Sequence, residues 1–140
     1  MIRVAIADDH SELRLAMRLF LGRSKDVEVV CEASNGREAV ECVRMYRPDV
    51  LVMDVGMPGL NGFAAAEEIG GMAAGTRVIL MSIHEDRAFV EKARALGAQG
   101  FITKGELVGS LRAAIERVYG GGDWGLELEK RDRDRDWRLG

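Results

Sequence analysis

The stretch Val50-Leu51-Val52-Met53-Asp54 is followed at once by Val55-Gly56-Met57-Pro58-Gly59-Leu60-Asn61-Gly62. An unbroken apolar run bounded by turn-forming residues is typical of a strand that is buried on both faces. The carboxylate of Asp54 comes where this strand ends and a loop rich in Gly and Pro begins. Because open α/β sheets bind their ligands at the carboxyl ends of the strands, Asp54 is the first candidate for a functional residue.

The rest of the chain repeats the alternation of a short apolar strand and an amphipathic helix. Apolar residues at helical spacing, with Gly or Pro as stop signals, separate the strands. We expect strands at 2–7, 27–33, 50–53, 77–81 and 101–103, and helices at 11–22, 37–46, 63–69, 86–96 and 106–119. Short connections and right-handed crossovers turn such units into a parallel sheet with helices on both faces, which is a doubly wound α/β fold.

Composition narrows the class of protein. The 140 residues are 47% hydrophobic and 31% charged, as in a folded globular domain, and the net charge of −3 lacks the basic excess of a nucleic-acid binder. We expect no membrane span, because no apolar run approaches about 20 residues. We also expect no signal peptide and a cytoplasmic location. Cys31 and Cys42 do not form a CxxC pair and are expected to be free, buried or half-buried thiols.

Other polar residues follow other expected strands. Asp8 and Asp9 come after the first strand, Ser82 after the fourth and Lys104 after the fifth. Taken singly, an Asp pair or a Ser at such a place is most often a helix cap, and a lone Lys is usually solvated. If the first strand lies beside the third, however, all of them meet Asp54 at one edge of the sheet. We therefore treat them as one candidate site.

The chemistry of this set points to phosphoryl transfer. Clustered carboxylates need a cation, and oxygen ligands with open water positions suit Mg²⁺. Lys104 can pair with Asp54 at rest and with a phosphoryl oxygen later, and the Ser82 hydroxyl can donate to another. Asp54 is then the nucleophile that forms an aspartyl-phosphate. His10 and His84 have no Cys or His partners at zinc spacing, so neither is interpreted as a metal ligand.

Four motifs in this order resemble the receiver domain of two-component response regulators. They are Ala7-Asp8-Asp9-His10, Asp54 to Gly62, Met81-Ser82-Ile83-His84, and Gly97 to Lys104, and the resemblance covers about residues 2 to 120. Ser-Ile-His and Phe-Ile-Thr-Lys look most like the branch that precedes a LuxR-type helix-turn-helix. The resemblance implies a flavodoxin-like (βα)5 three-layer sandwich with strand order 2-1-3-4-5.

The resemblance also implies roles for the candidate residues. A sensor histidine kinase would transfer a phosphoryl group to Asp54. Mg²⁺ would be held by Asp9, Asp54 and the backbone carbonyl of Gly56, with Asp8 acting mainly through metal-bound water. Such a chain is a phosphoacceptor regulator and not an enzyme, and it catalyses at most its own phosphorylation and dephosphorylation. A homodimer is a further expectation.

Ser82 and Phe101 would form the switch of the family. The hydroxyl would move toward the phosphoryl group while the aromatic ring turns inward. Ser82 replaces the commoner Thr and Phe101 the frequent Tyr, so no phenolic hydrogen bond can report the switch. Gly56 places no side chain over the acceptor, so we expect water to reach the aspartyl-phosphate easily and the phosphorylated form to be short-lived.

Three alternatives have different requirements. A phosphatase of the haloacid-dehalogenase type needs a second Asp where this chain has Gly56. A flavodoxin-like cofactor binder needs a Gly/Ser/Thr-rich phosphate loop after the first strand, where residues 8–12 are acidic. A receiver-like binding module that is never phosphorylated remains open, and acetyl phosphate or beryllofluoride with Mg²⁺ would distinguish it.

The chain divides at about residue 120. Residues 1–120 are expected to form the receiver domain, and 121–140 a charged tail without an output domain, so that DNA would be bound only by a domain absent from this chain. Residues 123–128 could pack back on the domain. Residues 131–136 alternate Arg and Asp and are expected to be solvated. Alternatively, Trp124 and Trp137 anchor the tail to a partner or a second copy.

Overall fold

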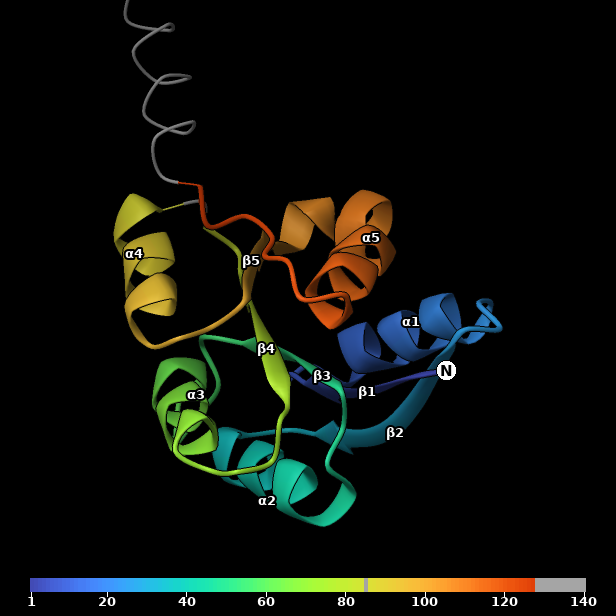
Figure 1. The fold of residues 1–140 in the computed structure, drawn as a ribbon, viewed down its shortest axis with the longest axis horizontal. Coiled ribbons are helices and arrows are strands. Elements are labelled where there is room, and N and C mark those ends of the chain that lie inside the picture. Colours follow the sequence, from blue (N-terminus) through green and yellow to red (C-terminus); the bar gives the residue numbers. More distant parts are fainter. Residues whose placement is uncertain (85, 128–140) are drawn as a thin grey trace, which may run out of the picture.

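The computed structural model describes residues 1–84 and 86–127, in which five strands alternate with five α-helices (Figure 1). The strands are β1 (Ile2–Ala7), β2 (Val27–Ala33), β3 (Val50–Asp54), β4 (Arg77–Ser82) and β5 (Gly100–Thr103). The α-helices are α1 (Ser11–Gly22), α2 (Gly36–Tyr46), α3 (Gly62–Gly70), α4 (Arg87–Ala95) and α5 (Leu107–Tyr119), and a 3-10 turn, η1 (Lys104–Glu106), precedes α5. The expected alternation is confirmed.

All neighbouring strands are parallel, in the order β2-β1-β3-β4-β5. Helices α1 and α5 cover one face of the sheet, and α2, α3 and α4 cover the other (Figure 1). Successive side chains of a strand point to opposite faces, so Leu51 and Met53 lie in the core beneath α2 and α3, whereas Val50 and Val52 lie in the core beneath α1 and α5. The predicted doubly wound sandwich and its strand order are therefore confirmed.

The boundaries of α2, α3, α4 and α5 differ from the expected ones by one residue, and for α2 and α5 the local reason is visible. Helix α2 begins one residue early, at Gly36, because the side chain of Asn35 accepts a hydrogen bond from the Glu38 N–H and caps the helix there. Helix α5 begins at Leu107, because a reciprocal capping box between Thr103 and Glu106 tightens the preceding residues into η1. This turn fixes Lys104 close to the end of β5.

The segment after α5 packs back on the sheet. The Trp124 N–H donates to the Gln99 carbonyl at 3.1 Å, and the Phe101 N–H donates to the Trp124 carbonyl at 2.8 Å. Leu126 is buried in the same core as Phe101. This segment therefore extends along β5, which agrees with the expectation for residues 123–128 as far as the described residues reach, to residue 127. Residues 131–136 and Trp137 lie outside the described residues.

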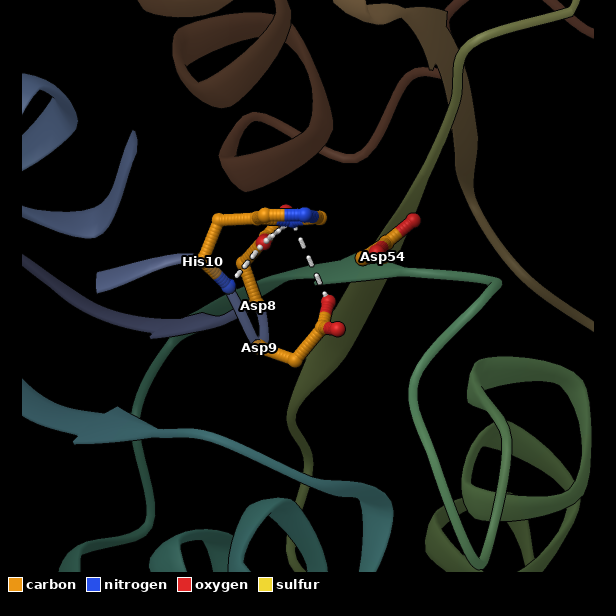
Figure 2. A group of neighbouring side chains, drawn as sticks. All are labelled: Asp8, Asp9, His10 and Asp54. Carbon is orange, nitrogen blue, oxygen red and sulfur yellow. Dashed lines mark hydrogen bonds and ion pairs between the residues drawn. The ribbon is translucent and has the colours of Figure 1, made fainter. Parts of the chain in front are cut away.

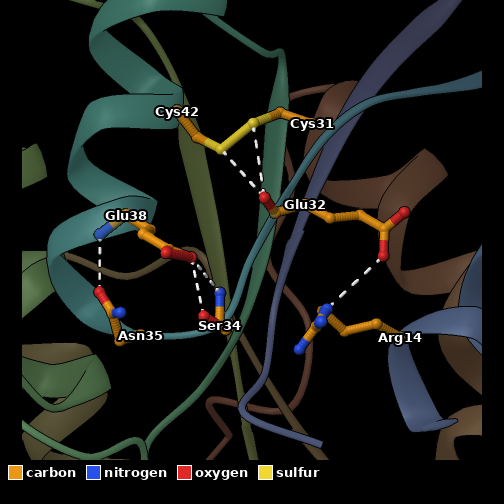
Figure 3. The surroundings of a disulfide bond; sticks show 7 residues. All are labelled: Arg14, Cys31, Glu32, Ser34, Asn35, Glu38 and Cys42. Carbon is orange, nitrogen blue, oxygen red and sulfur yellow. Dashed lines mark hydrogen bonds and ion pairs between the residues drawn. A yellow bond between two sulfur atoms is a disulfide. The ribbon is translucent and has the colours of Figure 1, made fainter. Parts of the chain in front are cut away.

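Cys31 and Cys42 form a disulfide, so the prediction of free thiols is wrong (Figure 3). Cys31 lies in β2 and Cys42 in α2, and their Cα atoms are 6.1 Å apart, within the range that a disulfide spans. The pairing arises because α2 folds back against β2, which a spacing of eleven residues does not reveal. None of the described helices is long and apolar enough to span a membrane.

Candidate functional site

The parallel sheet brings the expected site residues to one edge. β1 and β4 both pair with β3, and the register places Met81 beside Asp54 and Thr103 beside Ser82. Asp8 directly follows β1, and Lys104 directly follows β5. The edge therefore gathers residues from four strand ends that are far apart in the sequence.

Three carboxylates and one imidazole lie together at this edge (Figure 2). One ligand atom each from Asp8, Asp9, His10 and Asp54 lies within 4.8 Å of the others. Asp8 is completely buried and Asp54 is 6% exposed, whereas Asp9 lies on the solvent side. The site thus combines two buried carboxylates with one carboxylate at the surface.

The Lys104 ammonium lies between the two buried carboxylates. Its Nζ is 2.9 Å from Asp8 Oδ2 and 3.3 Å from Asp54 Oδ2. Burial lowers the pKa of Lys104, but the hydrogen bond to Asp8 and the charges of Asp54 and Asp8 outweigh burial and raise it overall. The lysine is therefore held in its charged form, one cation against two buried anions.

Burial raises the pKa of Asp54, and the negative charge of Asp8 adds to this effect. The Gly56 N–H, which donates to Asp54 Oδ1 at 3.2 Å, and the Lys104 charge oppose it without cancelling it. The ionised form of Asp54 is thus under-compensated in the folded protein. An additional cation at this edge would remove that penalty.

The turn that carries Asp8 and Asp9 is stabilised by local hydrogen bonds. Asp8 Oδ1 accepts from the His10 N–H at 2.8 Å, and an Arg14 Nη1–H donates to the Asp8 carbonyl at 2.5 Å. His10 Nδ1 lies 3.1 Å from Asp8 Oδ1 and 3.3 Å from Asp9 Oδ1. Zinc-type spacing does not predict this place for His10. Its position directly after the Asp pair, at the entrance of α1, is the signal that could have found it.

The loop from β3 to α3 approaches Asp54 closely. A Cβ added at Gly56 would lie 3.9 Å from Asp54 Oδ1 and 4.0 Å from Oδ2, so any larger residue there would begin beside the Asp54 carboxylate. At the other end of the loop, the Gly62 N–H donates to the Val55 carbonyl at 3.1 Å. Gly56 therefore places no side chain against the Asp54 carboxylate, and Gly62 lets α3 pack closely against the end of β3.

Ser82 and Phe101, the expected switch pair, are both 1% exposed. Ser82 Oγ accepts a hydrogen bond from the His84 N–H at 3.1 Å, at the carboxyl end of β4. The ring of Phe101 already lies inside the core, so the structure contains the inward position that the resemblance implies for the switched state. The role of the pair in switching stays a prediction.

With this geometry established, comparison with known proteins identifies the family. The family model of the response regulator receiver domain matches residues 4–116. The chain belongs to this family. It is 36% identical over 121 residues to the response regulator UvrY of Escherichia coli K12, which covers 86% of this chain and 56% of UvrY. It is 34% identical over 121 residues to the transcriptional regulatory protein DegU of Brevibacillus brevis, covering 86% of this chain and 51% of DegU.

Solved structures agree with this assignment. The signal receiver domain of the response regulator NarL from Mycobacterium tuberculosis superposes with a TM-score of 0.75 at 34% identity, covering 82% of this chain and 96% of that one. A two-component response regulator of the LuxR family from Aurantimonas gives 0.88 at 29% identity, with coverages of 100% and 99%. The likeness to LuxR-family receivers is confirmed. The chain spans about half the length of the curated relatives it matches.

The donor set of this receiver domain fits a hard divalent cation. Carboxylate oxygens from Asp8, Asp9 and Asp54 converge, and the Lys104 ammonium contacts both buried carboxylates. Mg²⁺ prefers oxygen ligands and retains waters, which the exposed side of the site would accommodate. The residues present therefore suit the metal that the sequence chemistry predicts.

Proposed function

We propose that this receiver domain is a phosphorylation-controlled switch that accepts a phosphoryl group from a sensor histidine kinase on Asp54 in a Mg²⁺-dependent phosphorelay. The observation that supports this most is a buried, under-compensated Asp54 carboxylate beside Lys104, Asp8 and Asp9 at the edge of the sheet. Two-component regulators of this family are signalling proteins and not classical enzymes. The domain would catalyse only its own phosphorylation and dephosphorylation.

In the proposed reaction, an oxygen of the Asp54 carboxylate attacks phosphorus and the bond from phosphorus to the kinase histidine nitrogen breaks. Lys104 would move from the Asp54 carboxylate to a phosphoryl oxygen, and the Ser82 hydroxyl would donate to another. Asp9, Asp54 and the Gly56 carbonyl would hold Mg²⁺, with Asp8 acting mainly through bound water. When bound, the metal neutralises charge that develops on the transferred group.

The signal would then leave the domain by a conformational change that involves Ser82 and Phe101. Its recipient would be a partner protein, a second copy of the chain or a DNA-binding output domain outside this chain. The longer length of UvrY and DegU favours the last of these. With its net charge of −3, the chain itself is not proposed to bind nucleic acid. We propose a cytoplasmic location, where the kinase would supply the phosphoryl group.

Phosphotransfer to matched variants tests the proposal. Wild type, Asp54→Asn and the control Asp26→Asn would be incubated with radiolabelled acetyl phosphate and Mg²⁺. Asp26 is an exposed carboxylate just before β2, at the amino end of the strands and therefore away from the site. Label is expected on wild type and on Asp26→Asn and not on Asp54→Asn. Equal labelling of all three proteins would refute the mechanism.

A binding module that is never phosphorylated is the second candidate. The buried position of Phe101 favours a binding module, because the ring is already inward without a phosphoryl group on Asp54. Beryllofluoride with Mg²⁺ separates the two candidates, because it mimics an aspartyl-phosphate and should shift the amide spectrum around residues 54, 82 and 101. A spectrum that stays unchanged would support the binding module.

A further inference from the structure

Arg14 lies in the first turns of α1 but faces inward. Its side chain is only 19% exposed, and it points across to β2, where Nε lies 3.5 Å from Glu32 Oε1 (Figure 3). Its Nη1–H reaches back and donates to the Asp8 carbonyl at 2.5 Å. The rigid planar fork of the guanidinium directs Nη1 to the Asp8 carbonyl, while Nε lies within ion-pair distance of Glu32 and has no hydrogen-bond partner among the described residues.

The Asp8 carbonyl belongs to the peptide unit that joins Asp8 to Asp9. Fixing this carbonyl therefore fixes the plane from which the Asp9 side chain departs. The Asp8 side chain has its own restraints, namely the His10 N–H and Lys104. The Asp9 carboxylate is 32% exposed and has His10 as a neighbour. The orientation of the Asp9 carboxylate therefore depends more on this peptide plane than the orientation of the Asp8 carboxylate does.

We infer that Arg14 is a positioning residue that orients the Asp8–Asp9 turn for a divalent cation, and that Glu32 anchors it. This inference rests on the proposed function, because it assumes that the carboxylates bind Mg²⁺. Residues that orient metal ligands from behind typically change metal affinity by 10- to 100-fold.

A purely electrostatic role would have the opposite sign. Arg14 is a cation near a cation site, so its removal by itself would strengthen Mg²⁺ binding. Glu32 offsets much of that charge, and the contact to Asp8 is to a carbonyl and not to a carboxylate. The direction of the change in affinity therefore separates orientation from charge.

Arg18 provides a matched control. It lies one turn further along α1 and its Nη1–H donates to Oε2 of the same Glu32 at 2.9 Å. Replacing Arg18 removes the same charge from the same carboxylate and leaves the contact between Arg14 and Asp8 in place. If Mg²⁺ affinity changes only because Glu32 in β2 loses an ion-pair partner, replacing Arg14 and replacing Arg18 should change it equally.

The experiment measures Mg²⁺ binding by titration calorimetry in the full chain, with melting temperature in EDTA as the check on folding. Arg14→Gln is expected to raise the dissociation constant about tenfold. Arg14→Lys, which keeps the charge and loses the fork, should lie between Arg14→Gln and wild type. Arg18→Gln should stay within about twofold of wild type. Asp54 labelling of Arg14→Gln by acetyl phosphate should recover at saturating Mg²⁺.

The outcomes are distinguishable. Affinity that is unchanged or higher in Arg14→Gln overturns the inference, as does a loss that Arg18→Gln shares. A fall in melting temperature together with labelling that saturating Mg²⁺ does not restore would show a structural role only and would also overturn it. If wild type itself neither binds Mg²⁺ nor becomes labelled, the proposed function fails as well. If wild type does both, only the role of Arg14 is at stake.

Discussion

Replacing Gly62 by Ala should disturb both the fold and the site. Gly62 is the first residue of α3, and a Cβ built there would lie 2.1 Å from the Asp54 carbonyl oxygen and 2.7 Å from the Val55 Cα. Both of these atoms belong to the backbone and cannot rotate away. Either α3 or the end of β3 must therefore move to accommodate one methyl group.

The size of the effect follows from these distances. Ordinary van der Waals contact begins at 3.4 Å, so the backbone would have to separate by more than 1 Å. Overpacking of this kind costs about 1–3 kcal/mol, and losing the bond from Gly62 N–H to the Val55 carbonyl costs about 1 kcal/mol more. We expect the free energy of unfolding to fall by about 3 kcal/mol. The moving backbone carries Asp54, so its labelling rate should also fall.

Urea unfolding and Asp54 labelling by acetyl phosphate, both at a temperature where the variant is folded, test this prediction. At about 2 kcal/mol per molar urea, the midpoint should fall by about 1.5 M. Gly109→Ala in α5 is the control, because a Cβ there meets nothing within 4 Å. It should raise stability by about 0.5–1 kcal/mol and leave labelling unchanged. A Gly62→Ala midpoint and labelling rate equal to those of wild type would refute the close approach of α3 to Asp54.

Three further predictions concern the disulfide, the charge of Asp54 and the glycine at position 56. Reducing the Cys31–Cys42 disulfide, which closes a loop with a sequence separation of eleven, should lower the free energy of unfolding by about 3 kcal/mol. The urea midpoint of wild type should therefore depend on reductant, and that of the variant with both Cys replaced by Ser should not. A wild-type midpoint that does not change with reductant would contradict the disulfide. Burial raises the pKa of Asp54, so the folded protein binds its proton more tightly than the unfolded chain, and this group's contribution to stability falls as pH rises from the ordinary carboxyl pKa through the raised one. Metal-free Asp54→Asn should therefore be more stable than wild type at neutral pH, and this gain in stability should disappear in acid. Urea unfolding in EDTA measures both. A variant that is less stable than wild type at neutral pH would contradict the destabilising charge of Asp54. Gly56→Met and Gly56→Arg should lengthen the half-life of the aspartyl-phosphate, because their side chains begin about 4 Å from the acceptor oxygens and hinder water; phosphate release at an unchanged rate would show that this position does not control access.

Sequence periodicity was sufficient for the fold because the central strands are buried on both faces. Val50 to Met53 are all fully buried, so they appear in the sequence as an unbroken apolar run. The candidate site followed from the same pattern, since residues directly after parallel strands share an edge. Asp54 and Lys104 meet for this reason although fifty positions separate them.

Specific contacts between separate elements could not be predicted in this way. The Cys31–Cys42 disulfide depends on which side of α2 faces β2, and the contact of Arg14 with Asp8 depends on how α1 leaves the turn. Trp124 was a candidate anchor, but only the structure shows that it hydrogen-bonds along β5. Periodicity specifies which face of an element is buried and not which partner it meets there.

The charge balance of the site is the strongest physical reason to expect a ligand. Asp8 and Asp54 are buried beside each other with Lys104 as their shared cation, and burial of Asp54 raises its pKa. An arrangement that only stabilised the fold would pair each buried carboxylate or replace it, because an under-compensated buried charge is destabilising. A bound cation and a phosphoryl group would change this balance in opposite directions, first adding positive charge and then adding negative charge at Asp54. The proposed phosphorylation switch would use this difference in charge between its two states.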